Sequence, residues 1–252
     1  MSGVAAGSLS DGTREFLLCL ADDEHLMGQR HTEWIGVAPF LEEDLALASI
    51  GQDELGHAAM LYELLSGPGR DIDDIALGRS AGEYRSCWLV EQKCPDWSDA
   101  LVRHWMYDTA ESLRWQMFEK SSIDELRGIA ARALGEESFH VMHAEAMVAA
   151  LSLSSDAHSR LAHSIAELLS LGVAMFEAPA GELDAIDDGV VSTSMVTLLP
   201  EWQQRVDARF GEQDWAAVDT VHQNGRTTRS DSFAPMYDVM REVLLIDPEA
   251  KW

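Results

Sequence analysis

The chain has 252 residues, is 46% hydrophobic and carries a formal net charge of -26. A chain of this length and apolar content can bury a substantial core without disulfides. The strong negative charge argues against nucleic acid and against an anionic membrane surface as partners, because both bind clustered Lys and Arg side chains.

The distribution of apolar residues and cysteines predicts a soluble, cytoplasmic protein. Residues 1–16 lack a basic region followed by a long apolar run, and no run of about 18 apolar residues occurs in the chain. Cys19, Cys87 and Cys94 form neither a paired framework nor a close C-x-x-C pair. We therefore expect reduced thiols without assigned chemistry and no membrane partner.

Helical periodicity dominates the chain in order from the N-terminus. Apolar residues at spacings of three and four recur from about residue 13 to 147 and again beyond 155, whereas strand signals are scarce. The sequence therefore predicts an all-α fold with four long helices before residue 153. Their breaks are expected near residues 36–39, 66–69, 93–96, 121–124 and 153–156.

The remainder of the chain is predicted to extend this bundle. We expect a fifth helix over about 155–177, an acidic loop over 178–192, and helical pieces near 194–210 and 231–245, with a turn at 222–226. The interpretation is a single ferritin-like domain spanning residues 1–252. Its four-helix metal-binding core covers about 13–152, and a C-terminal helical extension covers about 153–252.

Each long helix has one face that points into the bundle, here called its seam, which is found by alternating steps of three and four residues. All four seams are apolar at their ends and ionisable in their middle. Unpaired carboxylates in a helical core lose their hydration and have to be protonated. Since the seams themselves supply no Arg or Lys, the pattern favours bound cations over a network of ion pairs.

The ionisable positions have the spacing of a two-metal centre. Glu54-x-x-His57 and Glu137-x-x-His140 each place an oxygen and a nitrogen ligand one turn apart on one helix face. One such pair is common by chance, but two copies on apolar seams, each preceded by another seam carboxylate, indicate a metal site. The predicted ligands are Glu24, Glu54, His57, Glu111, Glu137 and His140.

Two iron ions bring four positive charges to the four carboxylates of this set, and manganese suits the same ligands. Asp108 lies one turn before Glu111 and remains an alternative ligand, or a hydrogen-bond partner of a ligating histidine. Six neighbouring residues are interpreted as ordinary helix-surface or core residues: Asp53, Glu136, His143, His31, His104 and Trp34. Roles in a pocket remain open for His31, His104 and Trp34.

Several segments carry a resemblance to a known family: residues 20–24, 29–30, 33–34, 43–48, 53–56, 89–92 and 248–252. Through them the chain resembles, nearly end to end, the C subunit of bacterial phenylacetyl-CoA epoxidase, a ferritin-like family of phenylacetic acid catabolism. The resemblance implies a helical bundle that pairs with a homologous subunit. The complex inserts one oxygen atom of dioxygen into an aromatic ring held as its CoA thioester.

Two features depart from that family. Its C subunit is generally described as a structural partner with degenerate metal ligands, whereas the ligand set here is intact. The family's basic, histidine-containing segment before the final helix is altered and reads from Arg226 to Phe233.

The leading functional hypothesis is a di-iron, oxygen-activating monooxygenase or epoxidase, or a subunit of one, acting on an aromatic acyl thioester or a similar small aromatic. Because the sequence has no Gly-rich nucleotide fingerprint, electrons are expected from a separate reductase. A homologous ferritin-like subunit or a second copy of the chain is the other expected partner. The alternatives are a non-catalytic structural subunit and a ferritin-like protein that handles iron or peroxide.

Overall fold

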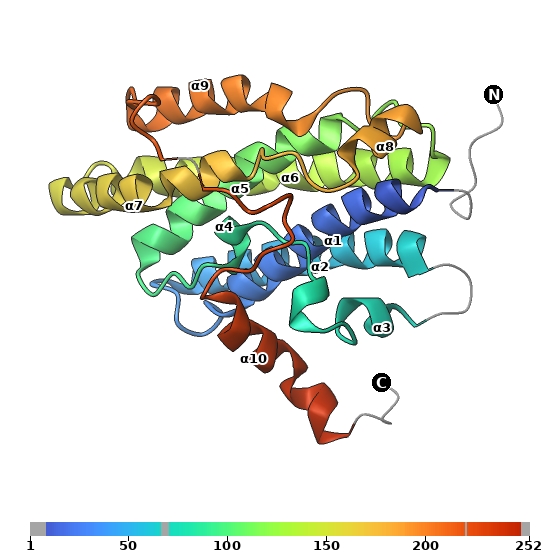
Figure 1. The fold of residues 1–252 in the computed structure, drawn as a ribbon. Helices are drawn as coiled ribbons and strands as arrows, with labels where there is room; N and C mark the ends of the chain where they lie inside the picture. Colours follow the sequence, from blue (N-terminus) through green and yellow to red (C-terminus); the bar gives the residue numbers. More distant parts are fainter. Residues whose placement is uncertain (1–8, 67–70, 220, 248–252) are drawn as a thin grey trace.

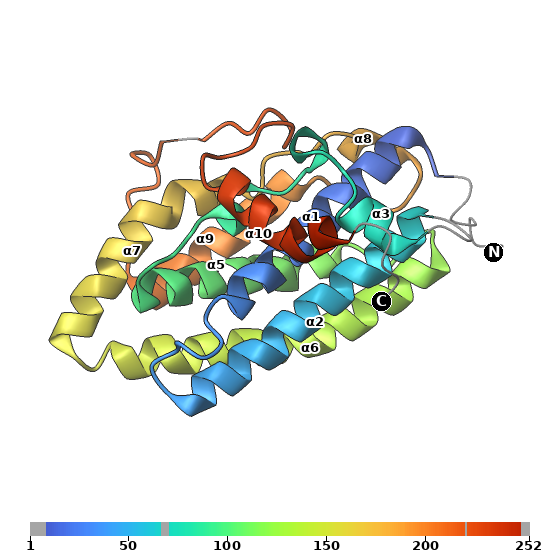
Figure 2. The same ribbon diagram turned by 90° about the horizontal axis from the view of Figure 1, so that it is seen from below.

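The computed structural model describes residues 9–66, 71–219 and 221–247, and every regular element within these ranges is a helix. Four long helices form a bundle (Figure 1): α1 (Asp11–Thr32), α2 (Leu41–Ser66), α5 (Trp97–Gln116) and α6 (Asp124–Leu151). α1 packs against α2, α5 against α6, and α2 against α6, which run side by side in Figure 2. This arrangement confirms the predicted all-α, ferritin-like fold. Residues 67–69 of the expected second break, and the segment 248–252 that contributed to the resemblance, lie outside the described ranges.

Short polar contacts define where the long helices begin. The Ser10 side chain caps α1 by accepting a hydrogen bond from the backbone N–H of Thr13, and Asp96 caps α5 through Ser98. Asp44, in the first turn of α2, accepts the backbone N–H groups of Gly36 and Ala38 at 3.0 and 3.1 Å. These bonds satisfy donors that a helix end or a turn leaves free. The turn that reverses the chain between α1 and α2 is thereby fixed.

Two glycines allow α1 and α2 to approach closely. A Cβ on Gly28 would lie 2.8 Å from the Leu55 side chain, and one on Gly51 would lie 3.2 Å from the Gly28 carbonyl oxygen. Both positions therefore need the small side chain for packing rather than for backbone conformation. The close crossing brings the middle of α1 against the middle of α2, where Glu24 and Glu54 lie.

Further helices cover the bundle: α3 (Ile72–Ala76), α4 (Trp88–Glu91), α7 (Ser155–Ala174), α8 (Glu182–Asp187), α9 (Leu199–Phe210), α10 (Phe233–Ile246) and the 3-10 helices η2 (Ala81–Glu83) and η3 (Met195–Leu198). The prediction of a loop over 178–192 is wrong at α8. The Glu182 carboxylate is buried there and accepts hydrogen bonds from the Ser194 hydroxyl and the Met195 backbone N–H. A tertiary contact of this kind leaves no periodic signal in six residues.

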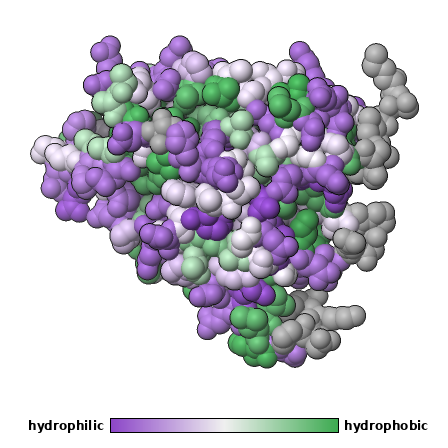
Figure 3. All heavy atoms as spheres, in the orientation of Figure 1, coloured by the Kyte–Doolittle hydropathy of each residue, from purple (hydrophilic) through white to green (hydrophobic). Residues whose placement is uncertain are grey.

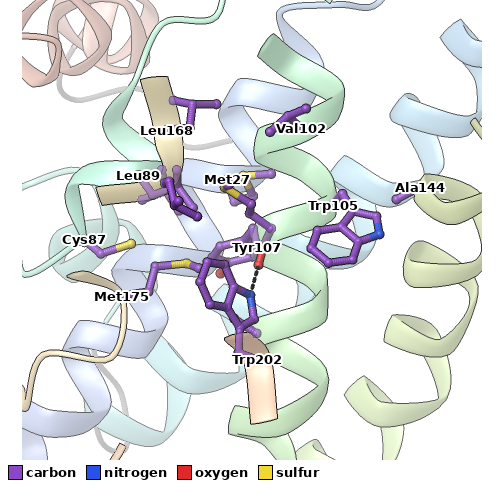
Figure 4. Packing of buried hydrophobic residues seen from close by; sticks show 14 of the residues in the cluster. Met27, Cys87, Leu89, Val102, Trp105, Tyr107, Ala144, Leu168, Met175 and Trp202 are labelled. Carbon is purple, nitrogen blue, oxygen red and sulfur yellow. Dashed lines mark hydrogen bonds between the residues drawn. The ribbon is translucent and has the colours of Figure 1, made fainter. Parts of the chain in front are cut away.

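The buried apolar side chains form two clusters at opposite ends of the bundle. One joins α5 to α7, α9 and α10, and in Figure 4 the Trp202 indole of this cluster donates its N–H to the Met106 carbonyl oxygen at 3.1 Å. The other contains Phe16, Trp115 and Phe118. On α1 and α6, the ionisable seam residues Glu24, Glu137 and His140 fall between residues of the two clusters, and the ionisable seam residues of α2 and α5 are buried as well. They therefore lie in a poorly hydrated environment.

The cysteines are buried and free. Burial raises the pKa of the Cys87 thiol to about 12 and raises the pKa values of Cys19 and Cys94 as well. None of the three is therefore primed as a nucleophile in this fold.

The surface has an apolar region on α10. Its exposed side chains are 58% to 79% accessible, and hydrophobic atoms gather over the tip of this helix in Figure 3: Val239, Val243, Leu245 and Ile246. Among the described residues, no helix combines the length and apolar character needed to cross a bilayer.

Candidate metal centre

Two groups of buried side chains meet between the apolar clusters. Single ligand atoms of Glu24, Glu54, His57 and Glu137 all lie within 4.8 Å of one another, and the same holds for Asp108, Glu137 and His140. These residues come from all four long helices and are at most 2% exposed. Because Glu137 belongs to both groups, the groups adjoin and share one carboxylate. Such an arrangement can hold two metal ions with a bridging ligand.

Both histidines turn the same ring nitrogen towards the carboxylates. His57 Nδ1 lies 3.1 Å from Glu24 Oε2 and 3.9 Å from Glu137 Oε1. His140 Nδ1 lies 3.2 Å from Glu137 Oε1 and 3.8 Å from Glu54 Oε1. The two E-x-x-H pairs are thus used in equivalent ways, as their shared spacing predicts.

The outer ring nitrogens face two carboxylates near the surface. His57 Nε2 lies 2.8 Å from Glu136, and His140 Nε2 lies 3.4 Å from Asp53. Each of these acids comes from the opposite helix of the α2–α6 pair and is about a quarter to a third exposed. A carboxylate in this position fixes the ring orientation of a metal-ligating histidine. The sequence interpretation of both acids as ordinary surface residues missed this contact, although each directly precedes the glutamate of an E-x-x-H pair.

The pKa values of the buried acids and histidines show how charge is balanced in the centre. Burial, followed by the charge of Glu24, raises the pKa of Glu54 well above its usual range, and burial raises that of Glu137 to about 7. Burial alone disfavours a charged histidine, but the hydrogen bond to Glu24 at His57 and the nearby charge of Glu137 at His140 outweigh it and raise the pKa values of both histidines to about 9. Without another source of positive charge, the carboxylates depend on bound protons.

The unsatisfied atoms of the centre test whether metal ions fit. All four side-chain oxygens of Glu54 and Glu137 are buried and make no hydrogen bond within the described chain. Buried polar atoms in folded proteins nearly always have a partner. Four carboxylates and two imidazoles form the oxygen-rich donor set that iron and manganese favour. The buried Glu and His cluster can therefore bind metal, and its donors fit a metal pair.

Glu111 is placed differently from the other predicted ligands. It belongs to neither group and instead forms an ion pair with Arg114, whose guanidinium also lies 2.7 Å from Asp23. Arg114 is one turn beyond Glu111 on α5 and lies off the seam, yet its long side chain reaches inwards. The seams supply no Arg or Lys, as the sequence indicates, but an arginine from outside the seam pairs with Glu111. Asp108, the alternative that the sequence left open, belongs to the second group.

Three further histidines extend from Asp108 towards the surface. His104 Nδ1 lies 2.8 Å from Asp108 Oδ2, and His104 Nε2 lies 3.2 Å from His143 Nδ1. His143 Nε2 in turn lies 3.0 Å from Glu43, and the His31 ring packs edge-on against His104 at 4.9 Å. On the other side of the centre, Trp115 packs against the His57 ring at 5.6 Å. The centre is thus enclosed by rings on both sides.

Comparison with known proteins identifies the family. The family model described as phenylacetic acid catabolic protein matches residues 8–252. The chain belongs to this family. It is similar to the C subunit of 1,2-phenylacetyl-CoA epoxidase of Escherichia coli (strain K12), with 26% identity over 247 residues that cover 94% of this chain and 98% of the relative. The resemblance inferred from the sequence is therefore confirmed.

In this member of the phenylacetic acid catabolic protein family, the segment from Arg226 to Phe233 contacts buried acids of the interior. Arg226 is fully buried and forms an ion pair with Asp23, while Arg229 contacts Glu91 at 2.6 Å. Arg226 has φ +65°, a left-handed conformation that L residues seldom adopt, in a turn with Asn224 and Gly225. The two arginines are thus occupied by buried acids.

Proposed function

We propose that this protein is an oxygen-activating di-iron component of an epoxidase of the phenylacetyl-CoA type, acting on an aromatic acyl thioester or a similar small aromatic. The observation that carries the proposal is the pair of adjoining donor groups that share Glu137. Family membership supports the substrate class, since the Escherichia coli relative is named as a subunit of 1,2-phenylacetyl-CoA epoxidase.

In this proposal the metal ligands are the four acids and two histidines of the two groups: Glu24, Glu54, His57, Asp108, Glu137 and His140. Bound iron supplies the reduction of dioxygen and the oxidising power for oxygen insertion. The protein holds the histidine rings through Glu136 and Asp53. The apolar clusters on both sides keep water away from the centre.

The proposed activity requires partners. We infer a separate reductase as the electron source, because the sequence carries no nucleotide-binding fingerprint. We also infer a homologous ferritin-like subunit or a second copy of this chain. The exposed apolar side chains of α10 offer one surface for such a contact.

Metal analysis tests the central claim. After anaerobic reconstitution with ferrous iron, the chain should bind about two equivalents, and Glu54→Ala should lose most of that iron. With a chemical reductant and dioxygen, phenylacetyl-CoA should give an oxygenated product only with the loaded protein. Iron binding far below two equivalents, together with unchanged turnover in Glu54→Ala, contradicts the proposal.

Similarity to the C subunit of the Escherichia coli epoxidase favours a second candidate, a structural component that supports a catalytic homologue. The two candidates separate in a purified complex with such a homologue. Retained turnover after His57→Ala and His140→Ala favours the structural role, whereas loss of turnover favours catalysis at this centre. Dioxygen consumption without an oxygenated organic product points instead to iron or peroxide handling.

A further inference from the structure

Trp34 lies between two hollows on the side of the bundle where α1 ends. An outer groove of about 660 Å³ is lined by Arg30, Glu33, Trp34, Lys93 and Val239 among others, and lies between the end of α1, the segment that precedes α5, and α10. An inner cavity of about 10 Å³ is lined by Trp34 again, with His31, Trp97, Ala100 and His104. The outer groove has the size of a ligand site, whereas the inner cavity has room for roughly one water molecule.

The inner cavity has aromatic walls and unsatisfied polar groups. The Trp34 and Trp97 rings meet edge-on with centroids 5.1 Å apart. His31 is 2% exposed, and neither of its ring nitrogens has a hydrogen-bond partner within the described chain; the Trp97 indole N–H also lacks one. Aromatic walls favour a flat aromatic guest, and unpaired buried donors and acceptors favour a polar atom attached to it.

The inner cavity also adjoins the metal centre. His104 lines the cavity, and its Nδ1 lies 2.8 Å from Asp108 of the second donor group. A group held against His104 is therefore separated from the Asp108 carboxylate by a single imidazole ring. The cavity therefore places a guest close to this side of the centre.

The outer groove differs in charge from most of the surface. In a chain with a net charge of -26, it presents the exposed Lys93 and the guanidinium of Arg30, which pairs with Glu33 at 2.6 Å. Among the described residues, Lys93 forms no ion pair with an acidic side chain. A groove with an available cation attracts an anionic group, which the remaining acidic surface repels.

We propose that the groove and the cavity form one binding site for an aromatic acyl thioester, with the ring behind Trp34 beside His104 and the anionic carrier in the groove along Lys93. The identity of the ligand rests on the proposed function, whereas the site rests on the geometry. Because the cavity is as small as a water molecule, the ring enters only when the Trp34 side chain moves. Trp34 lies in the turn between α1 and α2 and is half-buried.

Calorimetric titration of the full chain without added metal tests the site, with phenylacetyl-CoA and free CoA as probes. Phenylacetyl-CoA should bind about 10- to 100-fold more tightly than free CoA, because the phenyl ring becomes buried. Ala100→Val narrows the inner cavity and should bring the two affinities together without changing that of free CoA. Lys93→Glu should weaken both probes, while Lys120→Glu, at an exposed turn beyond α5, serves as the matched control and should change neither.

A second variant covers the case in which Ala100→Val disturbs folding. Trp34→Ala removes the wall between the hollows, so phenylacetyl-CoA should associate faster in stopped-flow measurements while the rate for free CoA stays unchanged. Equal affinities for the two probes in the parent chain, or unchanged phenylacetyl-CoA binding in both cavity variants, overturn the inference.

The outcome is independent of the iron test. Iron binding without thioester binding rejects this site and leaves the proposed metal chemistry standing. Thioester binding with the expected variant effects, but without iron binding, supports the site and rejects the metal chemistry.

Discussion

Two sets of buried carboxylates lie close together in this protein and differ in their partners. Asp22, Asp23 and Glu91 each face an arginine: Arg79 for the first, Arg114 and Arg226 for the second, and Arg229 for the third. The carboxylates of the donor groups face histidines and one another, and within the described residues the oxygens of Glu54 and Glu137 lack hydrogen bonds.

The contrast is sharpest at neighbouring positions on α1. Asp23 receives two guanidinium groups and the backbone N–H of Cys87, whereas Glu24 receives only the His57 ring. Consecutive residues point to different sides of a helix, so one step along α1 separates an acid paired with two arginines from an acid of the first donor group. Burial alone therefore does not distinguish the two sets; the presence or absence of an arginine partner within the described chain does.

The largest expected effect comes from breaking the arginine-paired set. Arg226→Met should lower the free energy of unfolding by about 3–5 kcal/mol, because it removes a partner from the buried Asp23 carboxylate. Urea unfolding followed by circular dichroism measures this loss. Arg160→Met is the control, since its partners Asp96 and Asp156 are exposed and the change should stay within about 1 kcal/mol. Equal effects of the two variants would falsify the structural role of Arg226.

Substitution of a donor-group carboxylate, which has no arginine partner among the described residues, should instead change the stability that bound metal provides. Ferrous iron at about 100 times its dissociation constant should raise the unfolding free energy by roughly 2.7 kcal/mol, and Glu54→Gln should abolish most of this gain. In the metal-free protein the same substitution should be neutral or stabilising, because burial raises the pKa of Glu54 and makes its charged form costly. Thermal unfolding with and without iron separates the two effects. A large loss of metal-free stability in Glu54→Gln would contradict the comparison.

Asp108 and Glu111 lie one turn apart on α5 but belong to different sets, because Asp108 is in a donor group and Glu111 pairs with an arginine. Asp108→Asn should reduce bound iron from about two equivalents to about one, while leaving the metal-free stability nearly intact. Glu111→Gln should do the reverse, because it takes the partner from Arg114 and leaves the donor groups untouched. Iron content and urea unfolding of both variants decide the assignment. Iron loss in Glu111→Gln with none in Asp108→Asn would restore Glu111 as the ligand.

A smaller effect is expected from the outer carboxylates. Glu136→Gln should weaken iron binding by about 10- to 100-fold, because the His57 ring loses the carboxylate at its Nε2. Competition with a chelator measures the affinity. Glu125→Gln, an exposed acid on the same helix, is the matched control, and an equal change in both variants would reject a positioning role for Glu136.

The smallest effect concerns His31. Burial lowers the pKa of His31 well below its usual range, and the nearby His104, Arg103, His140 and His143 add to the shift. The unfolded chain therefore takes up a proton below about pH 6.5 that the folded chain refuses, so this residue reduces stability as the pH falls. His31→Phe should flatten the fall in unfolding free energy between pH 6.5 and 5.5 by roughly 1 kcal/mol. The exposed His158→Phe controls for the substitution, and equal slopes in the two variants would count against a buried neutral His31.

The sequence predicted the long helices and most of the candidate centre because both depend on periodicity. Apolar residues at steps of three and four predict each seam, and the two E-x-x-H pairs lie on the seams at the same depth. The structure brings Glu24, Glu54, His57, Glu137 and His140 together, as this pattern indicates.

The sequence did not predict contacts that depend on how far a single side chain extends in the folded structure. Asp108 joins the second donor group while Glu111 pairs with Arg114, and residue spacing does not show that the long Arg114 side chain reaches Glu111. α8 is likewise held by contacts of Glu182 with a later segment rather than by an apolar face of its own. Periodicity reports a face of a long helix but not the partner of a single polar atom.

The ion pair between Asp23 and Arg226 also has a consequence for synthesis of the chain. Its partners are 203 residues apart, so α1 leaves the ribosome long before the arginine that neutralises Asp23 has been made. We expect the wall of the centre formed by α1 to become rigid only after Arg226 has been made and has left the ribosome. Cys87, whose backbone bonds to Asp23, should accordingly react with alkylating agents in ribosome-bound chains that stop before residue 221, and become protected once the turn at Arg226 has emerged.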